Sequence, residues 1–215
     1  MEQEILTLDQ KLALKAIAQE GDLGAFYLSG GTALANYYLH HRFSDDLDFF
    51  SFGEIDPIFI HSYAEKLKLV INSKGFRFER LHDRYQFFFE LEKGELKVEF
   101  TRYPFSQLEN LGRFDGVQVD SFRDIAANKL MAVLDRFDPK DFVDLYFIIQ
   151  KTALPKIRAD VEKKFGHKIS PTFLAGELAK VRRIEALPKM IKPVTILELK
   201  NFFADLIKGL SPEIF

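Results

Sequence analysis

The sequence of 215 residues contains no cysteine. That absence excludes disulfide scaffolds, zinc sites built on cysteine and thiol nucleophiles. It also lacks an apolar run of the roughly 18 residues that a membrane helix needs, and its N-terminus (MEQEILTLDQ) has no signal-peptide pattern. Because 47% of the residues are hydrophobic and 29% are charged, we expect a cytoplasmic globular protein without a membrane partner, in one domain or two small ones.

Neither sign of charge dominates the whole chain, whose net charge is −2. Taken alone, that value argues against a general nucleic-acid binder. The total conceals a split, since residues 1–150 carry 17 Lys and Arg against 25 Asp and Glu, whereas residues 151–192 carry 11 against 4. Such asymmetry can mark a nucleic-acid or phosphate partner, and the alternative is a set of solvated helices.

The expected secondary structure changes character near residues 112–120. Before this boundary we expect helices at 8–20, 32–40 and 57–73, and strands at 25–29, 46–51, 76–81, 85–92 and 95–101, with an edge strand at 117–119. Lys93-Gly94 indicates a hairpin between two of these strands. After the boundary near residues 112–120 we expect helices at 121–137, 139–150, 155–165, 171–180 and 195–206. This order predicts an α+β fold, with a mixed β-sheet and flanking helices in residues 1–118 and a helical lobe in residues 119–215.

Three carboxylates suggest a metal site. Asp46 and Asp48 stand two apart in a predicted strand, so both project from one face. Two such carboxylates repel each other unless a cation lies between them, and Mg²⁺ suits this ligand type; the alternative is a solvated strand end. Glu99 shares a face of its predicted strand with Lys97. If the two strands are neighbours, Glu99 completes the cluster and Lys97 partly neutralises it or contacts a phosphate; otherwise the second strand is an edge strand with one polar face.

Gly30-Gly31-Thr32 lies between a predicted strand and a predicted helix. Two glycines let the backbone approach a ligand closely, and the N-terminus of a helix offers N–H groups to a phosphate. Taken alone, the pattern is weak, because Gly-Gly turns are common.

The Gly-Gly-Thr turn followed by the Asp46 and Asp48 carboxylates forms a pattern that is specific to one family. The run GGTALANYYLHHRFSDDLDFF closely resembles the AbiEii/AbiGii-type nucleotidyltransferase toxins of type IV toxin–antitoxin and phage-abortive systems. In that family a Gly-Gly-Thr-Ala-Leu turn precedes Arg-x-Ser-x-Asp-Leu-Asp-Phe, which here begins with Arg42 and Ser44. A Lys-x-Asp/Glu strand is matched by Lys97-Val98-Glu99, although Asp is common where Glu99 stands.

Two helical motifs extend the resemblance, which covers residues 26–149 and leaves 150–215 without a match. One is a helix with a lysine in an Ala/Leu-rich stretch, matched by Lys129. The other is Arg-Asp-x-x-Asp-Leu, matched with Lys140 in place of Arg and with Asp141 and Asp144. Lys cannot reproduce the bidentate contacts of Arg.

The same helical residues can be interpreted physically. Lys129 lies within an apolar stripe, where it either snorkels or faces an anion. Asp141 fits a capping box that begins at Asp138. That explanation does not reach Asp144, which we expect to orient Lys129 or an acceptor hydroxyl. Arg42 is as well suited to pairing with Asp45 or a helix end as to binding phosphate.

The resemblance implies a nucleotidyltransferase-like fold and transfer of an NMP from an NTP to RNA, with tRNA as the implied acceptor. It implies two Mg²⁺ ions, an antitoxin as partner and a helical lobe that completes the active site. If the acceptor is RNA, the charge of the basic segment 151–192 makes that segment the expected RNA-binding part. The implied metal ligands are Asp46, Asp48 and Glu99, and the implied catalytic residues are these with Lys129 and Asp144. The implied nucleotide-binding residues are Gly30, Gly31, Thr32, Arg42, Ser44, Lys97, Lys129 and Asp141. Two alternatives stay open: transfer to an antibiotic or a protein side chain, and a non-catalytic interaction module.

Overall fold

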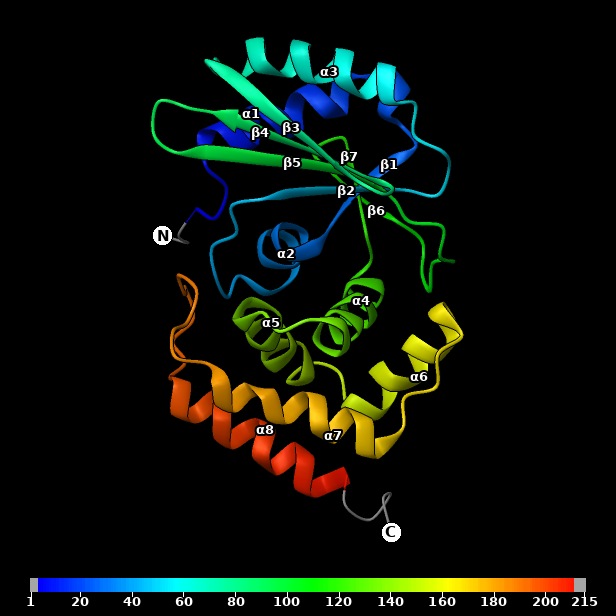
Figure 1. The fold of residues 1–215 in the computed structure, drawn as a ribbon, viewed down its shortest axis with the longest axis vertical. Coiled ribbons are helices and arrows are strands. Elements are labelled where there is room, and N and C mark those ends of the chain that lie inside the picture. Colours follow the sequence, from blue (N-terminus) through cyan, green and yellow to red (C-terminus); the bar gives the residue numbers. More distant parts are fainter. Residues whose placement is uncertain (1–3, 211–215) are drawn as a thin grey trace. The chain divides into compact units, whose positions relative to one another are not determined.

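The computed structural model describes residues 4–210, which fall into two compact units (Figure 1). The first unit comprises residues 4–37, Ser44–Phe105 and Asn110–Ser121. The second comprises Tyr38–Phe43, Ser106–Glu109 and residues 122–210.

The first unit is built on a seven-stranded mixed sheet, in the order β3-β4-β5-β2-β1-β7-β6. The strands are β1 (Phe26–Ser29), β2 (Leu47–Ser51), β3 (Gly75–Leu81), β4 (Arg84–Glu90), β5 (Glu95–Arg102), β6 (Gly112–Phe114) and β7 (Val117–Val119). Strand β2 runs parallel to β5, and β1 runs parallel to β7, whereas the other neighbours are antiparallel. The expected mixed sheet is confirmed, as is the hairpin that joins β4 to β5 at Lys93-Gly94.

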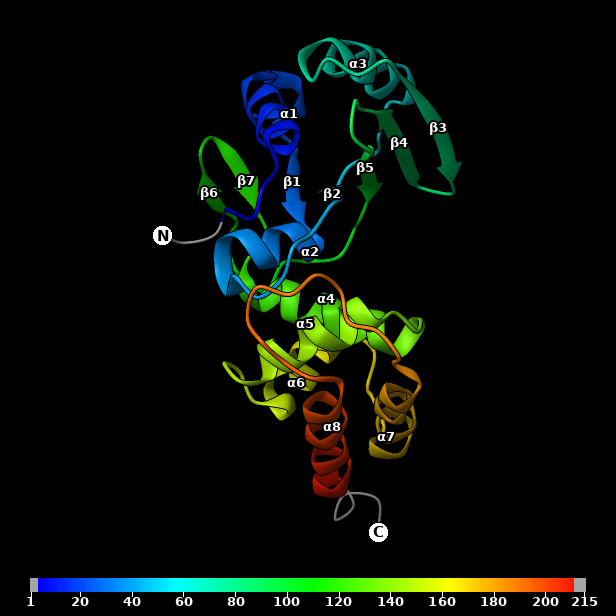
Figure 2. The same cartoon turned by 90° about the vertical axis from the view of Figure 1, so that its left-hand side faces the viewer.

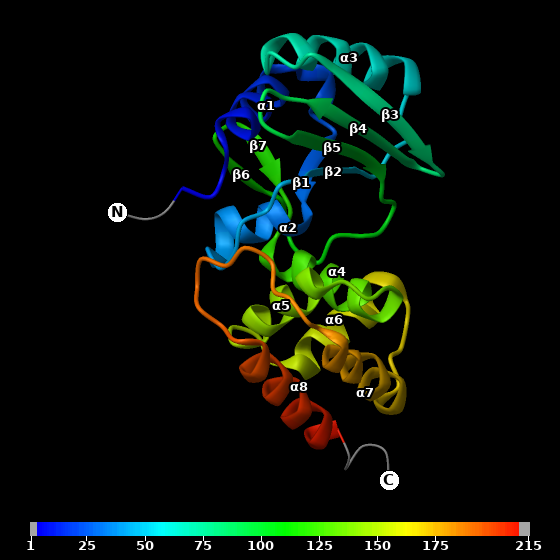
Figure 3. The ribbon, with the colours of Figure 1, turned by 60° about the vertical axis from the view of Figure 1, so that its left-hand side comes forward.

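Two helices, α1 (Leu8–Gln19) and α3 (Pro57–Val70), lie on one face of this sheet (Figures 1 and 3). They cover alternate strand residues that are fully buried, among them Phe49 of β2 and Phe100 of β5. The short helix α2 (Gly30–Ala33) lies on the other side of the sheet and continues into a π-helical turn, η2 (Leu34–Leu39). Since side chains alternate along a strand, the polar residues of β2 and β5 share the face opposite α1 and α3.

The expectation for residues 117–119 was wrong in one respect. Strand β7 is an interior strand, paired on one side with β1 and on the other with β6, and β6 forms that edge of the sheet. Strand β6 was not expected, because it has only three residues. The signal was the Asp115-Gly116 turn, where φ is 49° and 86°, as a two-residue hairpin requires.

The second unit is helical. Its helices are α4 (Phe122–Asp135), α5 (Pro139–Ile149), α6 (Leu154–Phe165), α7 (Pro171–Ala179) and α8 (Ile196–Leu210), with a 3₁₀ turn, η3 (Lys180–Arg183), after α7. Helices α7 and α8 pack side by side (Figure 2). All five expected helices are confirmed, with bounds shifted by a few residues. Within residues 4–210, no helix is long and apolar enough to cross a membrane.

One member of the basic segment 151–192 is not on the surface. The side chain of Lys164 is 1% exposed, and its ammonium lies 2.7 Å from a carboxylate oxygen of Asp124 in α4. Asp124 also accepts the backbone N–H groups of Leu108 and Glu109, which tie a loop of the second unit to α4. Lys164 therefore contributes to packing, and the surface charge of the segment comes from its other basic residues.

Candidate active site

Sheet register brings Asp48 and Glu99 together. In the parallel pair of β2 and β5, Asp48 stands directly beside Glu99, so both side chains project from the same face. The expectation that these two strands are neighbours is confirmed. On the other side of β2, Asp48 is opposite Ser29, the last residue of β1.

Gly30 follows Ser29 and lies against the carboxylate of Asp48. Its φ is +70°, and a Cβ added at this position would lie 2.5 Å from Asp48 Oδ2. Glycine is the residue type that combines this backbone conformation with this close approach. The Gly-Gly turn thus fits around the Asp48 side chain, and buried Gly31 continues it into α2.

The hydroxyl of Thr32 has a structural task in this arrangement. Thr32 is fully buried, and its Oγ1 donates a short hydrogen bond to the backbone carbonyl of Asp46. The carbonyl of Ser44 accepts a hydrogen bond of 2.8 Å from Gln10 Nε2 of α1. These bonds hold the backbone that leads into Asp46 and Asp48, so that α1 and α2 help to position both carboxylates.

The carboxylate of Glu99 is buried and surrounded by donors. Arg84 of β4 binds it in bidentate fashion, with Nε 2.5 Å from Oε1 and Nη2 2.9 Å from Oε2. Gln86, Lys97 and Thr101 donate at 2.7, 2.8 and 2.8 Å. Burial would raise the pKa of Glu99, but the hydrogen bonds from Arg84, Lys97 and Gln86 lower this pKa to about 2.

Lys97 connects Glu99 to the two aspartates electrostatically. Burial lowers the pKa of Lys97, but the hydrogen bond and charge of Glu99 and the charges of Asp48 and Asp46 together raise it. The Lys97 ammonium therefore interacts electrostatically with all three carboxylates, as expected from the shared face.

The donor set fits a metal ion only in part. Asp46 and Asp48 are partly exposed, and one or two carboxylates are sufficient for Mg²⁺ when substrate phosphates complete its shell. Glu99 does not fit, because both of its oxygens already accept hydrogen bonds. In agreement, no three His, Asp or Glu side chains within residues 4–210 are grouped to hold a metal ion. The metal-binding roles expected of Asp46, Asp48 and Glu99 stay predictions.

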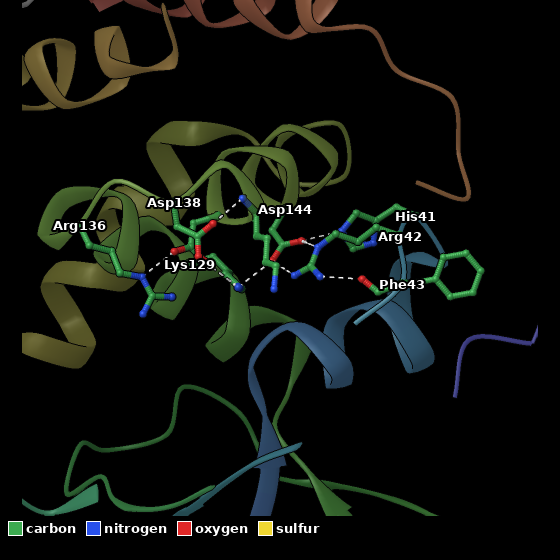
Figure 4. A network of polar contacts seen from close by, with 9 residues as sticks. His41, Arg42, Phe43, Lys129, Arg136, Asp138 and Asp144 are labelled. Carbon is green, nitrogen blue, oxygen red and sulfur yellow. Dashed lines mark hydrogen bonds and ion pairs between the residues drawn. The ribbon is translucent and has the colours of Figure 1, made fainter. Parts of the chain in front are cut away.

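A second polar cluster, in the helical unit, is centred on Asp144 of α5 (Figure 4). Arg42 binds Asp144 in bidentate fashion at 2.6 and 2.8 Å, and His41 Nε2 lies 2.7 Å from the same carboxylate. Lys129 of α4 adds an ion pair at 2.6 Å. The expected pairing of Arg42 with Asp45 is wrong: Arg42 is 2% exposed and its guanidinium contacts Asp144 and the carbonyl of Phe43.

Lys129 finds the anions that its burial requires. Its ammonium lies 2.8 Å from Asp141 in addition to Asp144, and Asp141 also accepts a hydrogen bond of 2.9 Å from Arg136. Asp141 therefore binds two cations instead of closing a capping box. The expectation that Asp144 orients Lys129 is confirmed, whereas contacts of Lys129, Asp141 and Arg42 with a nucleotide stay predictions.

The charges of this cluster stabilise one another. Burial alone would raise the pKa of Asp144, but Lys129, Arg42 and His41 hold it well below its usual value. Burial lowers the pKa of Lys129, yet Asp144 and Asp141 raise it overall. The pKa of His41 is lowered, because burial outweighs its hydrogen bond to Asp144.

Sequence reasoning missed Arg84, Gln86 and Thr101, which bind Glu99, and Asp120, which accepts a hydrogen bond of 2.8 Å from the Ser29 hydroxyl. The Lys93-Gly94 pattern alone does not identify the first group. A two-residue turn at Lys93-Gly94 would pair Gln86 with Thr101, whereas the observed register pairs Gln86 with Glu99 and Arg84 with Thr101. No local signal identifies Asp120 either, since 91 residues separate it from Ser29.

A family model described as "Nucleotidyl transferase AbiEii toxin, Type IV TA system" matches residues 12–213. The chain is 34% identical over 166 residues to an uncharacterized protein of Aquifex aeolicus (strain VF5), covering 74% of this chain and 76% of that protein.

Two solved structures from Helicobacter pylori share the fold. The structure of JHP933 has a TM-score of 0.58 at 20% identity and covers 96% of this chain and 92% of its own. A protein provisionally described as a nucleotidyltransferase has a TM-score of 0.59 at 19% identity, with coverage of 95% and 94%. At these identities the two structures establish the fold alone.

We predict that Gly30→Ala disrupts the site. A Cβ at this position meets the Asp48 carboxylate, and alanine at positive φ costs roughly 1–2 kcal/mol. Thermal unfolding should show a lower Tm, and nucleotidyl transfer should fall. Gly176→Ala in α7, where a Cβ meets nothing within 4 Å, is the matched control and should be neutral or stabilising by up to about 1 kcal/mol. Wild-type Tm and activity in Gly30→Ala would contradict this account.

We further predict that Asp144 contributes to acid sensitivity. Its pKa is depressed in the folded state, so its stabilisation is complete above the ordinary Asp pKa of about 3.9 and is lost as the pH falls below that value. Asp144→Asn should lose about 3–5 kcal/mol at pH 7, because buried Arg42 and Lys129 lose their partner. It should also show a weaker dependence of unfolding free energy on pH between about 4 and 2.

The measurement is urea unfolding at several pH values. Asp205→Asn provides the control, because Asp205 is 74% exposed in its pair with Lys208. An Asp144→Asn variant with the pH slope of the wild type would refute the assignment.

Proposed function

The chain belongs to the AbiEii nucleotidyl transferase toxin family of type IV toxin–antitoxin systems, and on that premise we propose that it transfers an NMP from an NTP to RNA in an Mg²⁺-dependent reaction. The observation that carries the proposal is the placement of Asp48 beside Glu99 and against Gly30, with Asp46 two residues before it. We propose tRNA as the acceptor, the cytoplasm as the location and a cognate antitoxin as the partner.

Asp46 and Asp48 are the residues that would hold Mg²⁺. When bound, the metal offsets phosphate charge and lowers the pKa of an acceptor hydroxyl. The protein contributes rigidity, because Thr32 and Gln10 fix the backbone around these aspartates. A carboxylate held by its backbone in this way pays little reorganisation at the moment of reaction.

Lys97 is placed to offset charge on the phosphates. The Lys97 side chain is 19% exposed, and its ammonium lies 2.8 Å from a carboxylate oxygen of Glu99 and interacts with the charges of Asp46 and Asp48. Negative charge that builds up on a leaving pyrophosphate would be stabilised by such a fixed cation. Gly30 and Gly31 would add backbone contacts, since glycine permits close approach of a ligand.

The exposed cations of the second unit suit a polyanionic acceptor. Eight of the eleven basic residues in 151–192 are exposed: Lys151, Lys156, Lys163, Lys168, Arg182, Arg183, Lys189 and Lys192. Phosphate contacts supply the sequence-independent part of RNA affinity. We propose that this set binds RNA and that buried Lys164 does not take part.

Asp48→Asn should abolish Mg²⁺-dependent incorporation of a labelled NMP, with a loss of about 10³-fold or more in kcat, since one oxyanion-stabilising or metal-holding group contributes on that order. Asp45→Asn is the matched control. Asp45 carries the same functional group three residues earlier and is exposed. Full activity of Asp48→Asn, or equal loss in both variants, would rule out the assigned role.

RNA binding should weaken steeply with salt and should depend on the second unit. The triple variant Lys163→Glu, Arg182→Glu, Arg183→Glu should flatten the slope of log K against log salt by about 2–3 units, because each phosphate contact made on binding releases about one counterion and the variant loses three such contacts. The control carries the same charge change at exposed lysines of the first unit (Lys66, Lys74 and Lys93). Salt-insensitive binding, or equal effects in both triple variants, would contradict this role.

A further inference from the structure

The carboxylate of Glu99 accepts contacts from four different side chains of β4 and β5. Oε1 accepts from Arg84 Nε and the Thr101 hydroxyl, and Oε2 accepts from Arg84 Nη2, Gln86 and Lys97. The side chain of Glu99 is 2% exposed. A metal ligand must offer an oxygen lone pair, and here all neighbouring positions are occupied by donors from β4 and β5.

We propose that Glu99 is a positioning residue for Arg84 and Lys97, and that Arg84 is a phosphate-binding residue of the nucleotidyl transfer reaction. This inference rests on the proposed function. It replaces the expectation that Glu99 holds the metal, leaving that role to Asp46 and Asp48.

Arg84 has the geometry of a held anion receptor. Its planar guanidinium binds Glu99 through Nε and Nη2. In contrast to the buried carboxylate, 39% of the Arg84 side chain is exposed. The buried carboxylate therefore fixes the direction of a cation whose side chain is partly open to solvent.

The charge balance favours phosphate at this place. Glu99 carries one negative charge, and Arg84 and Lys97 carry one positive charge each. These three residues, which we call the clamp, therefore have a net positive charge. It shares a sheet face with Asp48, beside which Glu99 stands in register. A triphosphate near Asp46 and Asp48 would be repelled by both unless cations lie close by. Holding two long side chains in place before binding also reduces the entropy lost on binding.

The ligand that we assign is the triphosphate of the NTP. A phosphate of the RNA backbone has the same recognition chemistry, and the two sources are separated by measuring inorganic tripolyphosphate and RNA independently. Arg84→Ala should weaken binding of tripolyphosphate by roughly 10- to 100-fold, the range for charge-assisted hydrogen bonds. Arg84→Lys, which keeps the charge and loses the fork, should fall between Arg84→Ala and the wild type.

Glu99→Gln tests the positioning role. It should weaken tripolyphosphate binding although Glu99 itself contacts no phosphate, and the double variant with Arg84→Ala should lose less than the sum of the two single losses. With saturating non-hydrolysable NTP, Mn²⁺ binding followed by electron paramagnetic resonance should be unchanged in Glu99→Gln and weakened in Asp48→Asn. Thermal unfolding confirms that each variant is folded.

Arg77→Ala is the matched control, because Arg77 is an exposed arginine of the neighbouring strand β3 that stacks on Phe88; it should bind tripolyphosphate as the wild type does. The inference is overturned if Arg84→Ala behaves like this control, if the wild type does not bind tripolyphosphate, if only RNA binding changes, or if Glu99→Gln loses Mn²⁺ as Asp48→Asn does.

Failure of the proposed function has a different signature. Tripolyphosphate binding that depends on Arg84, without transfer of NMP to RNA, would support the clamp and reject the acceptor. Transfer to RNA that is indifferent to Arg84→Ala would support the acceptor and reject the clamp.

Discussion

The parallel pairing of β2 with β5 is the constraint on which the first unit's chemistry depends. It places Asp48 beside Glu99 on one face of the sheet, while Phe49 and Phe100 enter the core on the other face. A shift of register by one residue would exchange these faces. Because the hydrophobic core fixes the register, it also fixes the relative position of the two carboxylates. Gly30, which follows β1 as the first residue of α2, lies against the Asp48 carboxylate.

Asp46, Asp48 and Glu99 differ in exposure and surroundings. Asp46 and Asp48 are partly exposed, and Thr32 holds the backbone carbonyl of Asp46. Glu99 is buried among Arg84, Lys97, Gln86 and Thr101, which depress its pKa to about 2. In the second unit Asp144 shows the same principle, since Arg42, Lys129 and His41 offset the cost of burying its charge. Both units thus use a buried carboxylate to fix the direction of cations.

The sequence predicted what depends on local pattern. Periodicity and capping residues identified the long helices, and alternation placed Asp46, Asp48, Lys97 and Glu99 correctly. Contacts between distant segments were beyond its reach: Arg42 and Asp144 are 102 residues apart, and burial of Lys164 depends on Asp124, 40 residues away. Strand β6 was not predicted, because three residues are too few to show the alternation of polar and apolar residues that marks a strand. The partners that β4 supplies to Glu99 were missed because a two-residue turn at Lys93-Gly94 does not predict the observed register of that strand.

One measurement tests the central claim most directly. The purified protein is incubated with total RNA, Mg²⁺ and each of the four labelled NTPs in turn, and the RNA is analysed for label. The account predicts labelled RNA with at least one NTP, lost when EDTA removes the metal and lost in Asp48→Asn. RNA that stays unlabelled with every NTP, or labelling that survives EDTA, would contradict it.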